Sequence, residues 1–169
     1  MFGDLQRGKV LAFSGVFIGL IAVGSWISVP FFPVPITLQT LFVILAATVM
    51  HRRAVIPVTL YVILGMLGLP VFHNGVAGIG ILLGPTGGYI IGFIPAALAT
   101  GLAYEQDRDS IRILGIIAAM VLVYTLGISW LMYSTGLGLI PALAVGMIPF
   151  VPGDVLKAFA AFQIAKRLP

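Results

Sequence analysis

The sequence contains no cysteine, only two histidines and few charged residues, which make up 8% of its 169 residues. Without cysteine the chain has neither a disulfide framework nor a thiolate metal site. Two histidines alone do not form a set of metal ligands. Charge is also far scarcer than the roughly 25% typical of soluble globular domains. We therefore expect no metal site, no cofactor and no soluble fold.

Apolar residues are abundant instead. Hydrophobic residues make up 60% of the chain, and its mean hydropathy is strongly positive. A spanning helix needs about 20 largely apolar residues, so a chain of this length has room for at most about seven or eight spans with almost no loops. This composition predicts one integral membrane domain covering residues 1–169, with the lipid bilayer as its surroundings.

Uninterrupted apolar runs predict an all-α polytopic protein with six transmembrane helices. The predicted spans are 10–28, 37–50, 54–68, 85–104, 111–133 and 152–165. The second, third and sixth runs are short. The first is longer than the roughly 7–15 residues of a signal-peptide core, which indicates an uncleaved span. No internal repeat is evident, so an inverted-repeat transporter gains no support.

Positive charges indicate the orientation of these spans. Every second loop is basic, and the positive-inside rule then places both termini in the cytoplasm, in a multi-pass protein of the cytoplasmic membrane. The cations that follow this rule are Arg7, Lys9, Arg52, Arg53, Arg108, Arg112, Lys166 and Arg167. The net charge of +4 therefore reflects membrane topology and does not indicate binding to nucleic acid.

Two charges, Asp154 and Lys157, do not fit this distribution and lie at the start of the last span. Three residues apart, they share a helix face, and a carboxylate in a first turn is favoured by the helix dipole. One interpretation is a structural ion pair with the lysine reaching outward, but an exposed pair contributes only about 0.3–0.5 kcal/mol. A charge toward mid-membrane costs about 2.5–3.5 kcal/mol, and such residues are usually functional. The pair suits a small ligand with N–H donors and acceptor or anionic groups.

The three external segments have no charge but many prolines and glycines, and we expect them to form partly helical loops that fold over the outer end of the bundle. Three prolines stiffen the first segment, 29–36. Thr37 is then expected at a helix N-cap, with Gln39 and Thr40 in the first turn. These side chains contact either a ligand or neighbouring helices.

The second and third segments are longer. In the second, Asn74 offers donors and acceptors, whereas His73 has no partner in the sequence and is assigned no chemical role. Pro85 is expected at the first position of a helix whose N-terminus favours an anion. Gly87 and Gly88 then allow close approach of a ligand, or only of another helix. In the third segment, residues 139–147 predict a short interfacial helix.

Enzyme functions find little support. No Ser-His-Asp order, HExxH motif, pair of catalytic carboxylates or Cys-His arrangement occurs. A proton-coupled pore would need polar residues through the inner halves of the spans, and those halves are nearly all aliphatic. The sequence favours a binding protein that is open to the outside and sealed below.

Four motifs resemble the signature segments of the BioY family, the biotin-binding membrane S components of energy-coupling-factor (ECF) importers. They are VPITLQT at 34–40, GLPVF at 68–72, LGPTGGY at 83–89 and PGDVLK at 152–157. The resemblance implies six spans, with biotin held near the external face for import. It also implies that Asp154 and Lys157 contact the polar parts of biotin.

The remaining site residues also follow from this resemblance. It implies that Asn74 and Gln39 assist the charged pair, and that Phe72 and Tyr89 cover the biotin rings with the first external segment. Helix N-terminal amides near Gly84 to Gly88 offer donors for the biotin carboxylate.

The resemblance further implies a partner, because S components of this family dock on a coupling transmembrane subunit driven by two ATPases. Gly15 and Gly19 form a GxxxG motif that suits such docking, or only packing of the first span within the bundle. The chain has no Walker motif, so ATP hydrolysis is assigned to the partners. Two alternatives stay open, a solitary biotin transporter and an S component for another vitamin.

Overall fold

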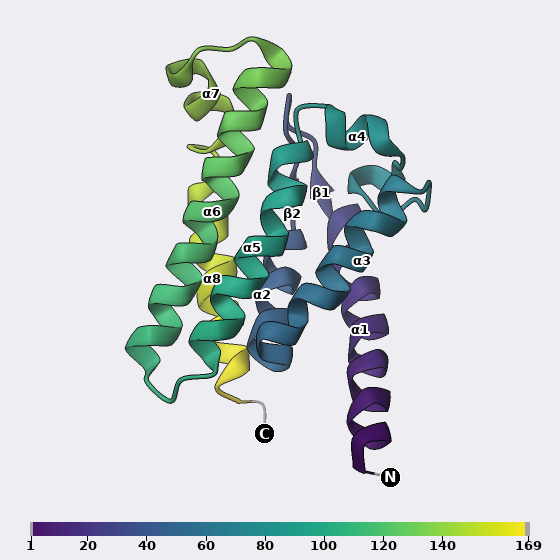
Figure 1. Cartoon of the computed structure of the whole chain (residues 1–169). Coiled ribbons are helices and arrows are strands. Elements are labelled where there is room, and N and C mark those ends of the chain that lie inside the picture. Colours follow the sequence, from purple (N-terminus) through teal and green to yellow (C-terminus); the bar gives the residue numbers. More distant parts are fainter. Residues whose placement is uncertain (1, 168–169) are drawn as a thin grey trace.

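Apolar helices form most of the computed structural model, which describes residues 2–167, with side chains from residue 7 onward. The elements, in chain order, are α1 (Phe2–Trp26), β1 (Ser28–Val29), β2 (Ile36–Thr37), α2 (Gln39–Met50), η1 (His51–Ala54), α3 (Val55–Met66), η2 (His73–Gly75), α4 (Ile79–Leu83), α5 (Gly87–Tyr104), α6 (Asp109–Thr135), α7 (Leu139–Gly146) and α8 (Val151–Ala165). The helices run roughly side by side, with β1, β2, α4 and α7 at one end of the bundle (Figure 1). We call this the hairpin end.

Within the described residues, four helical stretches are long and apolar enough to cross a membrane: Arg7–Trp26, Gln39–Met66, Gly87–Tyr104 and Asp109–Thr135. Helices α7 and α8 form a fifth if they are taken as one span with a 51° bend. The chain is therefore a mostly helical polytopic membrane protein. The six spans predicted from sequence are not resolved separately by length and composition, because most of the second and third predicted spans lies within the single stretch Gln39–Met66.

The stretch Gln39–Met66 reverses direction near His51, whose φ angle is 53°. Just before α2, the Leu38 amide donates to the Gly24 carbonyl at 2.9 Å. Just after α3, the Pro70 carbonyl accepts from Trp26 Nε1 at 3.0 Å. Both ends of the stretch thus lie beside the C-terminal end of α1, and α2 and α3 run in opposite directions (Figure 1).

A glycine in α5 permits this reversal. A Cβ atom added to Gly101 would collide with the His51 carbonyl and would lie 2.7 Å from the Arg52 amide nitrogen. Helix α5 therefore packs directly on the backbone of η1, which only a residue without a side chain allows.

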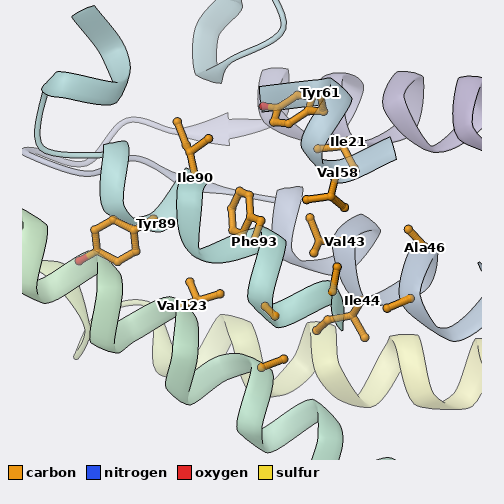
Figure 2. Packing of buried hydrophobic residues seen from close by; sticks show 14 of the residues in the cluster. Ile21, Val43, Ile44, Ala46, Val58, Tyr61, Tyr89, Ile90, Phe93 and Val123 are labelled. Carbon is orange, nitrogen blue, oxygen red and sulfur yellow. The ribbon is translucent and has the colours of Figure 1, made fainter. Parts of the chain in front are cut away.

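The hydrophobic core lies where four helices meet. Figure 2 shows Val43 of α2, Val58 of α3, Phe93 of α5 and Val123 of α6 among the buried side chains. Their burial removes apolar surface from water or lipid and packs α5 between its neighbours.

Charged residues gather at the end opposite the hairpin end, where α1 begins and α8 ends; we call it the charged end. There Arg52 pairs with Glu105 at 3.2 Å and Lys166 pairs with Asp109 at 2.5 Å. Among residues 7–167, Asp154 and Lys157 are the charged side chains that lie away from this end.

The first external segment differs from the expected loop, because β1 and β2 pair antiparallel, Ser28 with Thr37 and Val29 with Ile36. The intervening proline loop (residues 30–35) carries the three prolines, which cannot donate to a strand ladder. Since Thr37 belongs to β2, the N-cap of α2 is Leu38, although the Thr37 hydroxyl still accepts from the Gln39 amide at 3.3 Å.

The structure also tests the predicted start of one helix and the existence of another. Helix α5 begins at Gly87 rather than Pro85, because a turn in which the Gly87 amide donates to the Gly84 carbonyl at 3.1 Å precedes it. The short helix predicted in the third external segment is confirmed as α7.

The contact between Gly101 and η1 predicts a selective loss of stability. Gly101→Ala should cost about 1–3 kcal/mol, as overpacking usually does, because the His51 backbone must move. Gly15→Ala is the matched control, since an added Cβ there meets no atom within 4 Å. Thermal unfolding in detergent, followed by circular dichroism, should show a lower midpoint for Gly101→Ala only. Equal midpoints would contradict this account of the reversal.

Candidate binding site

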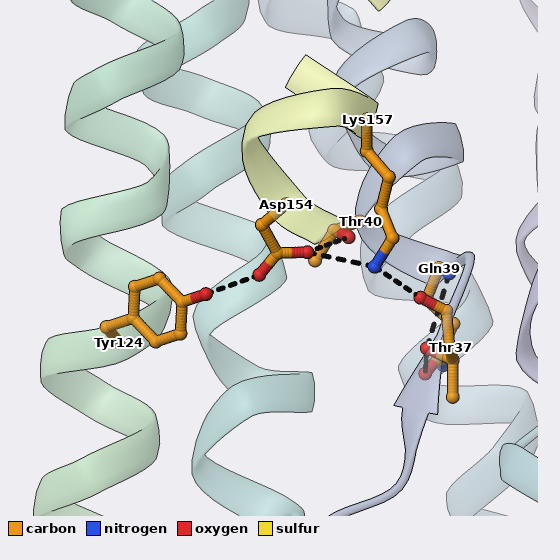
Figure 3. A network of polar contacts seen from close by, with 6 residues as sticks. All are labelled: Thr37, Gln39, Thr40, Tyr124, Asp154 and Lys157. Carbon is orange, nitrogen blue, oxygen red and sulfur yellow. Dashed lines mark hydrogen bonds and ion pairs between the residues drawn. The ribbon is translucent and has the colours of Figure 1, made fainter. Parts of the chain in front are cut away.

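The centre of the candidate site is the carboxylate of Asp154, in the first turn of α8. Asp154 is only 6% exposed. Its Oδ2 accepts from the Tyr124 hydroxyl of α6 at 2.5 Å, and its Oδ1 accepts from the Thr40 hydroxyl of α2 at 3.0 Å and from Lys157 Nζ at 2.9 Å (Figure 3). Donors from three helices therefore stabilise one buried negative charge, as a buried charge requires.

Lys157 turns inward rather than reaching toward the membrane surface. Its side chain is 10% exposed, and its Nζ also donates to the Thr37 carbonyl at 2.6 Å. The interpretation of an exposed ion pair with an outward lysine is thus wrong. The ammonium instead connects α8 to β2, the strand that follows the proline loop.

The pair keeps unused hydrogen-bonding capacity. A carboxylate has about four lone-pair positions, and an ammonium has three N–H donors. Three donors already reach Asp154, and two acceptors already reach Lys157. About one acceptor position and one donor position remain for a ligand, side by side.

Gln39 is buried next to this pair and links two external segments. Its Oε1 accepts from the Thr37 hydroxyl at 2.9 Å, and its Nε2 donates to the Tyr61 hydroxyl at 2.5 Å. Tyr61 in turn donates to the Val71 carbonyl at 2.9 Å. This chain of hydrogen bonds fixes Gln39 and ties β2 to the segment after α3.

These residues border a cavity of about 50 Å³ under the proline loop. Its polar lining comes from Thr37, Gln39, Thr40, His73, Thr86, Tyr89, Tyr124, Asp154 and Lys157, and its apolar lining from Val34, Pro35, Ile90, Phe93, Val123 and Phe150. Pockets that hold drug-sized ligands occupy about 300–1,000 Å³. The cavity has the mixed lining of a ligand site, but its walls must move apart to admit a ligand of that size.

A much larger groove, of about 820 Å³, lies on the other side of the Asp154–Tyr124 contact, between α6, α7 and α8. Its lining is almost entirely apolar, and Asp154 and Tyr124 border both spaces. Because Lys157, Gln39 and His73 face only the smaller cavity, we assign ligand recognition to that cavity.

The structure brings four of the sequence-predicted site residues to this cavity: Asp154, Lys157, Gln39 and Tyr89. Tyr89 donates its hydroxyl to the Gly146 carbonyl of α7 at 2.9 Å. Its ring is thereby fixed on the cavity wall.

Three other predicted site residues lie outside the cavity lining. Asn74 is exposed and accepts from the Ser28 hydroxyl at 2.5 Å, which ties β1 to η2. Phe72 is fully buried and packs edge-on against Tyr61, with ring centroids 5.6 Å apart. A Cβ on Gly88 would collide with Trp130 and the Leu126 carbonyl, so this glycine serves close packing of α5 on α6.

Sequence reasoning missed Tyr124 and assigned no role to His73. A signal existed for Tyr124, because a phenol inside an otherwise aliphatic span needs a hydrogen-bond partner. His73 lines the cavity, and its buried Nδ1 has no hydrogen-bond partner among residues 2–167. Burial lowers the pKa of the His73 imidazole below its usual range, which favours the uncharged ring.

The predicted docking glycines lie on an open face of α1. A Cβ added to Gly15 or Gly19 would meet no other atom within 4 Å. Packing within the bundle, the alternative explanation of this motif, does not use these two positions.

Comparisons with known proteins agree with one another. The sequence matches the BioY family over residues 4–169. It is 42% identical over 157 residues to the biotin transporter BioY of Thermotoga maritima, covering 92% of each chain. It is 39% identical over 164 residues to the probable biotin transporter BioY of Pyrococcus horikoshii, covering 96% of this chain and 98% of the relative.

A solved structure shares the fold. The crystal structure at 2.1 Å of the S-component for biotin from an ECF-type ABC transporter matches with a TM-score of 0.87 and 26% identity, over 97% of this chain and 92% of that chain. The family match and the similarity in sequence and fold extend over nearly the whole length. The chain belongs to the BioY family.

Proposed function

We propose that this chain is the substrate-binding S component of an ECF-type biotin transporter, which captures biotin with high affinity at the external face and takes part in its import. The observation that carries this proposal is the buried Asp154–Lys157 pair beside a cavity, in a chain of this family. Biotin is then the transported ligand, and no cofactor is needed.

The chemistry of the pair suits the ureido ring of biotin, which has N–H donors and one strong carbonyl acceptor. The remaining acceptor position of Asp154 takes one ureido N–H, and the remaining donor of Lys157 reaches the ureido carbonyl. Both are charge-assisted hydrogen bonds, which are roughly twice as strong as neutral ones. Tyr89, Phe93 and Val34 line the same cavity and supply an apolar surface for the thioether ring.

Six membrane crossings fit this function, within one domain formed by residues 1–169. In this topology α2 and α3 cross separately, α7 lies at the external surface, and α8 forms the last crossing. The cations at the charged end support a cytoplasmic location for both termini under the positive-inside rule, in the cytoplasmic membrane. The cavity at the hairpin end then faces outward.

Binding requires the proline loop to move, because the cavity of about 50 Å³ is several times smaller than pockets for ligands of this size. Three contacts hold the loop and its strands in place. They are the Lys157 bond to the Thr37 carbonyl, the Ser28 bond to Asn74, and the edge-on packing of Phe31 against Phe150 with centroids 6.1 Å apart.

In this proposal the energy for transport comes from partner subunits, namely a coupling transmembrane subunit and two ATPases. The open face of α1 around Gly15 and Gly19 allows a helix of the coupling subunit to approach closely. In this proposal the chain is not an enzyme, and ATP hydrolysis is carried out by the partners.

Removing the charge of Asp154 should weaken biotin binding. Asp154→Asn leaves the buried Lys157 ammonium without its counterion, and we expect a cost of about 2 kcal/mol or more, roughly 30-fold in Kd. Calorimetry, or the fluorescence of Trp26 at the end of α1, measures the affinity. Asp109→Asn, a half-exposed carboxylate at the charged end, is the matched control and should bind as the wild type does. Unchanged affinity in a folded Asp154→Asn variant would refute the role of this carboxylate.

Movement of the proline loop can be tested because the natural chain has no cysteine. Val34 is 5% exposed and lines the cavity, whereas Phe32 is 90% exposed. A Val34→Cys variant should react slowly with a maleimide, through transient opening, and biotin should slow the reaction further. Phe32→Cys should react quickly with or without biotin. Labelling of Val34→Cys that is insensitive to saturating biotin would contradict the proposed opening.

Docking through α1 should be separable from binding. Replacing Gly15 and Gly19 together by Leu blocks the open face of α1, so co-purification with the coupling subunit and ATP-dependent biotin uptake into vesicles should fall. Biotin affinity should stay unchanged, because neither glycine lines the cavity. Wild-type uptake by this chain alone in vesicles would instead establish a solitary transporter.

A further inference from the structure

The apolar groove between α6, α7 and α8, of about 820 Å³, takes no part in the proposed recognition of biotin. On α6 its lining runs from Ile113 to Met132, about 28 Å at roughly 1.5 Å per residue. This length is close to the roughly 30 Å of hydrocarbon in a bilayer. Since Phe159 in its lining is 61% exposed, the groove is open to its surroundings, which are lipid at this depth. An unfilled groove would lose dispersion contacts along its walls, so the space suits acyl chains.

A second space, of about 440 Å³, lies at the charged end, with a lining from α2, η1, α5, α6 and α8. We call it the charged-end pocket. Phe162 of α8 lines both the apolar groove and this pocket, so the two spaces adjoin. Lys166 Nζ lies over the Phe162 ring, 4.6 Å from its centroid. One molecule with an apolar chain and a polar head can therefore occupy both spaces.

Positive charge prevails in the charged-end pocket. Arg112 and Lys166 line it together with a single carboxylate, that of Asp109. Asp109 pairs with Lys166 at 2.5 Å and with Arg112 at 3.8 Å, which leaves one formal positive charge. Among residues 7–167, eight Lys or Arg side chains and three carboxylates lie at the charged end as a whole. Basic pockets between membrane helices bind anionic lipid headgroups.

A buried hydroxyl in the same lining has no partner. Tyr104, the last residue of α5, is 7% exposed, and its hydroxyl makes no hydrogen bond among residues 2–167. Such an unpaired buried group is costly and uncommon in proteins. The Arg112 guanidinium lies over the Tyr104 ring, 5.5 Å from its centroid. A phosphate bound to Arg112 thus lies close to a donor that lacks an acceptor.

We propose that an anionic phospholipid binds this protein, with its phosphate in the charged-end pocket and one acyl chain in the apolar groove. Arg112 and Lys166 donate charge-assisted hydrogen bonds to the phosphate, and the Tyr104 hydroxyl donates a further one. The acyl chain packs on Phe162 and on the aliphatic faces of α6 and α8. This site is separate from the cavity proposed for biotin, so the inference goes beyond the proposed function and does not depend on it.

Native mass spectrometry of the full chain with added lipid tests recognition of the headgroup. Phosphatidylglycerol, which is anionic, is compared with phosphatidylcholine, which has no net charge, with the same acyl chains. The wild type should bind phosphatidylglycerol at least about tenfold more tightly, as hydrogen bonds to a charged group imply. Arg112→Gln with Lys166→Gln should reduce this preference to less than about threefold. Arg108→Gln with Arg167→Gln is the matched control, because it removes two exposed cations outside the pocket, and should keep the preference.

Tyr104→Phe tests the unpaired hydroxyl without changing any charge. The variant keeps the ring beneath Arg112 and removes a group that has no partner in the structure. Its unfolding midpoint without added lipid, followed by circular dichroism, should therefore not fall. Its affinity for phosphatidylglycerol should fall by about three- to tenfold, as loss of one hydrogen bond does.

A pair of variants on α6 tests the acyl chain. Ile117 and Leu114 are 53% and 62% exposed, but of the two only Ile117 lines the groove. Ile117→Trp fills part of the groove and should weaken binding of both lipids by about tenfold, the effect of displacing about two methylene groups. Leu114→Trp is the matched control and should bind both lipids as the wild type does.

Several results would overturn the inference. Equal affinity of the wild type for the two lipids, or an equal fall in the two double variants, would exclude a headgroup site in the pocket. Unchanged affinity for phosphatidylglycerol in Tyr104→Phe would exclude the hydroxyl as a donor. Equal affinities of Ile117→Trp and Leu114→Trp would exclude an acyl chain in the groove. A dimer that Ile117→Trp dissociates would assign the groove to a second copy of this chain instead.

Discussion

A single buried carboxylate holds together the hairpin end of this protein. An apolar bundle accommodates the carboxyl group of Asp154 because Tyr124 and Thr40 donate to it from α6 and α2, and Lys157 from its own helix. A buried charge that loses its partners is strongly destabilising, so these elements are held together by a shared electrostatic requirement. The position of α8 relative to α2, and of β2 relative to both, follows from it.

The same requirement links the site to the loops. Lys157 reaches the backbone of β2, Gln39 connects β2 with the segment after α3, and Asn74 connects that segment back to β1. These bonds satisfy the polar side chains of Thr37, Gln39, Ser28 and Asn74 within the protein. Rigid helices thus position the charged pair, while short hydrogen-bonded segments above it remain the elements that can separate.

Sequence patterns predicted much of the fold and the centre of the site, because both depend on local composition. Apolar runs predicted the main helices, and the unusual positions of Asp154 and Lys157 among the charged residues indicated a polar site. The reversal at His51 depends on the close approach of Gly101, a contact between residues 50 positions apart that no local pattern reveals. Likewise, the inward position of His73 and the outward position of Asn74, its neighbour, follow from the loop backbone, where Asn74 has a φ of 55°.

In the proposed opening of the proline loop, the bond from Lys157 to the Thr37 carbonyl makes affinity a property of two states, closed and open. A ligand that must first separate β2 from α8 binds only the open fraction of the population, so its apparent dissociation constant is the intrinsic one divided by that fraction. Selection on this family can then adjust affinity at the strands and the proline loop without changing any group that contacts the ligand. In that opening, the free-energy difference between the closed and open forms governs capture and release together with the site itself.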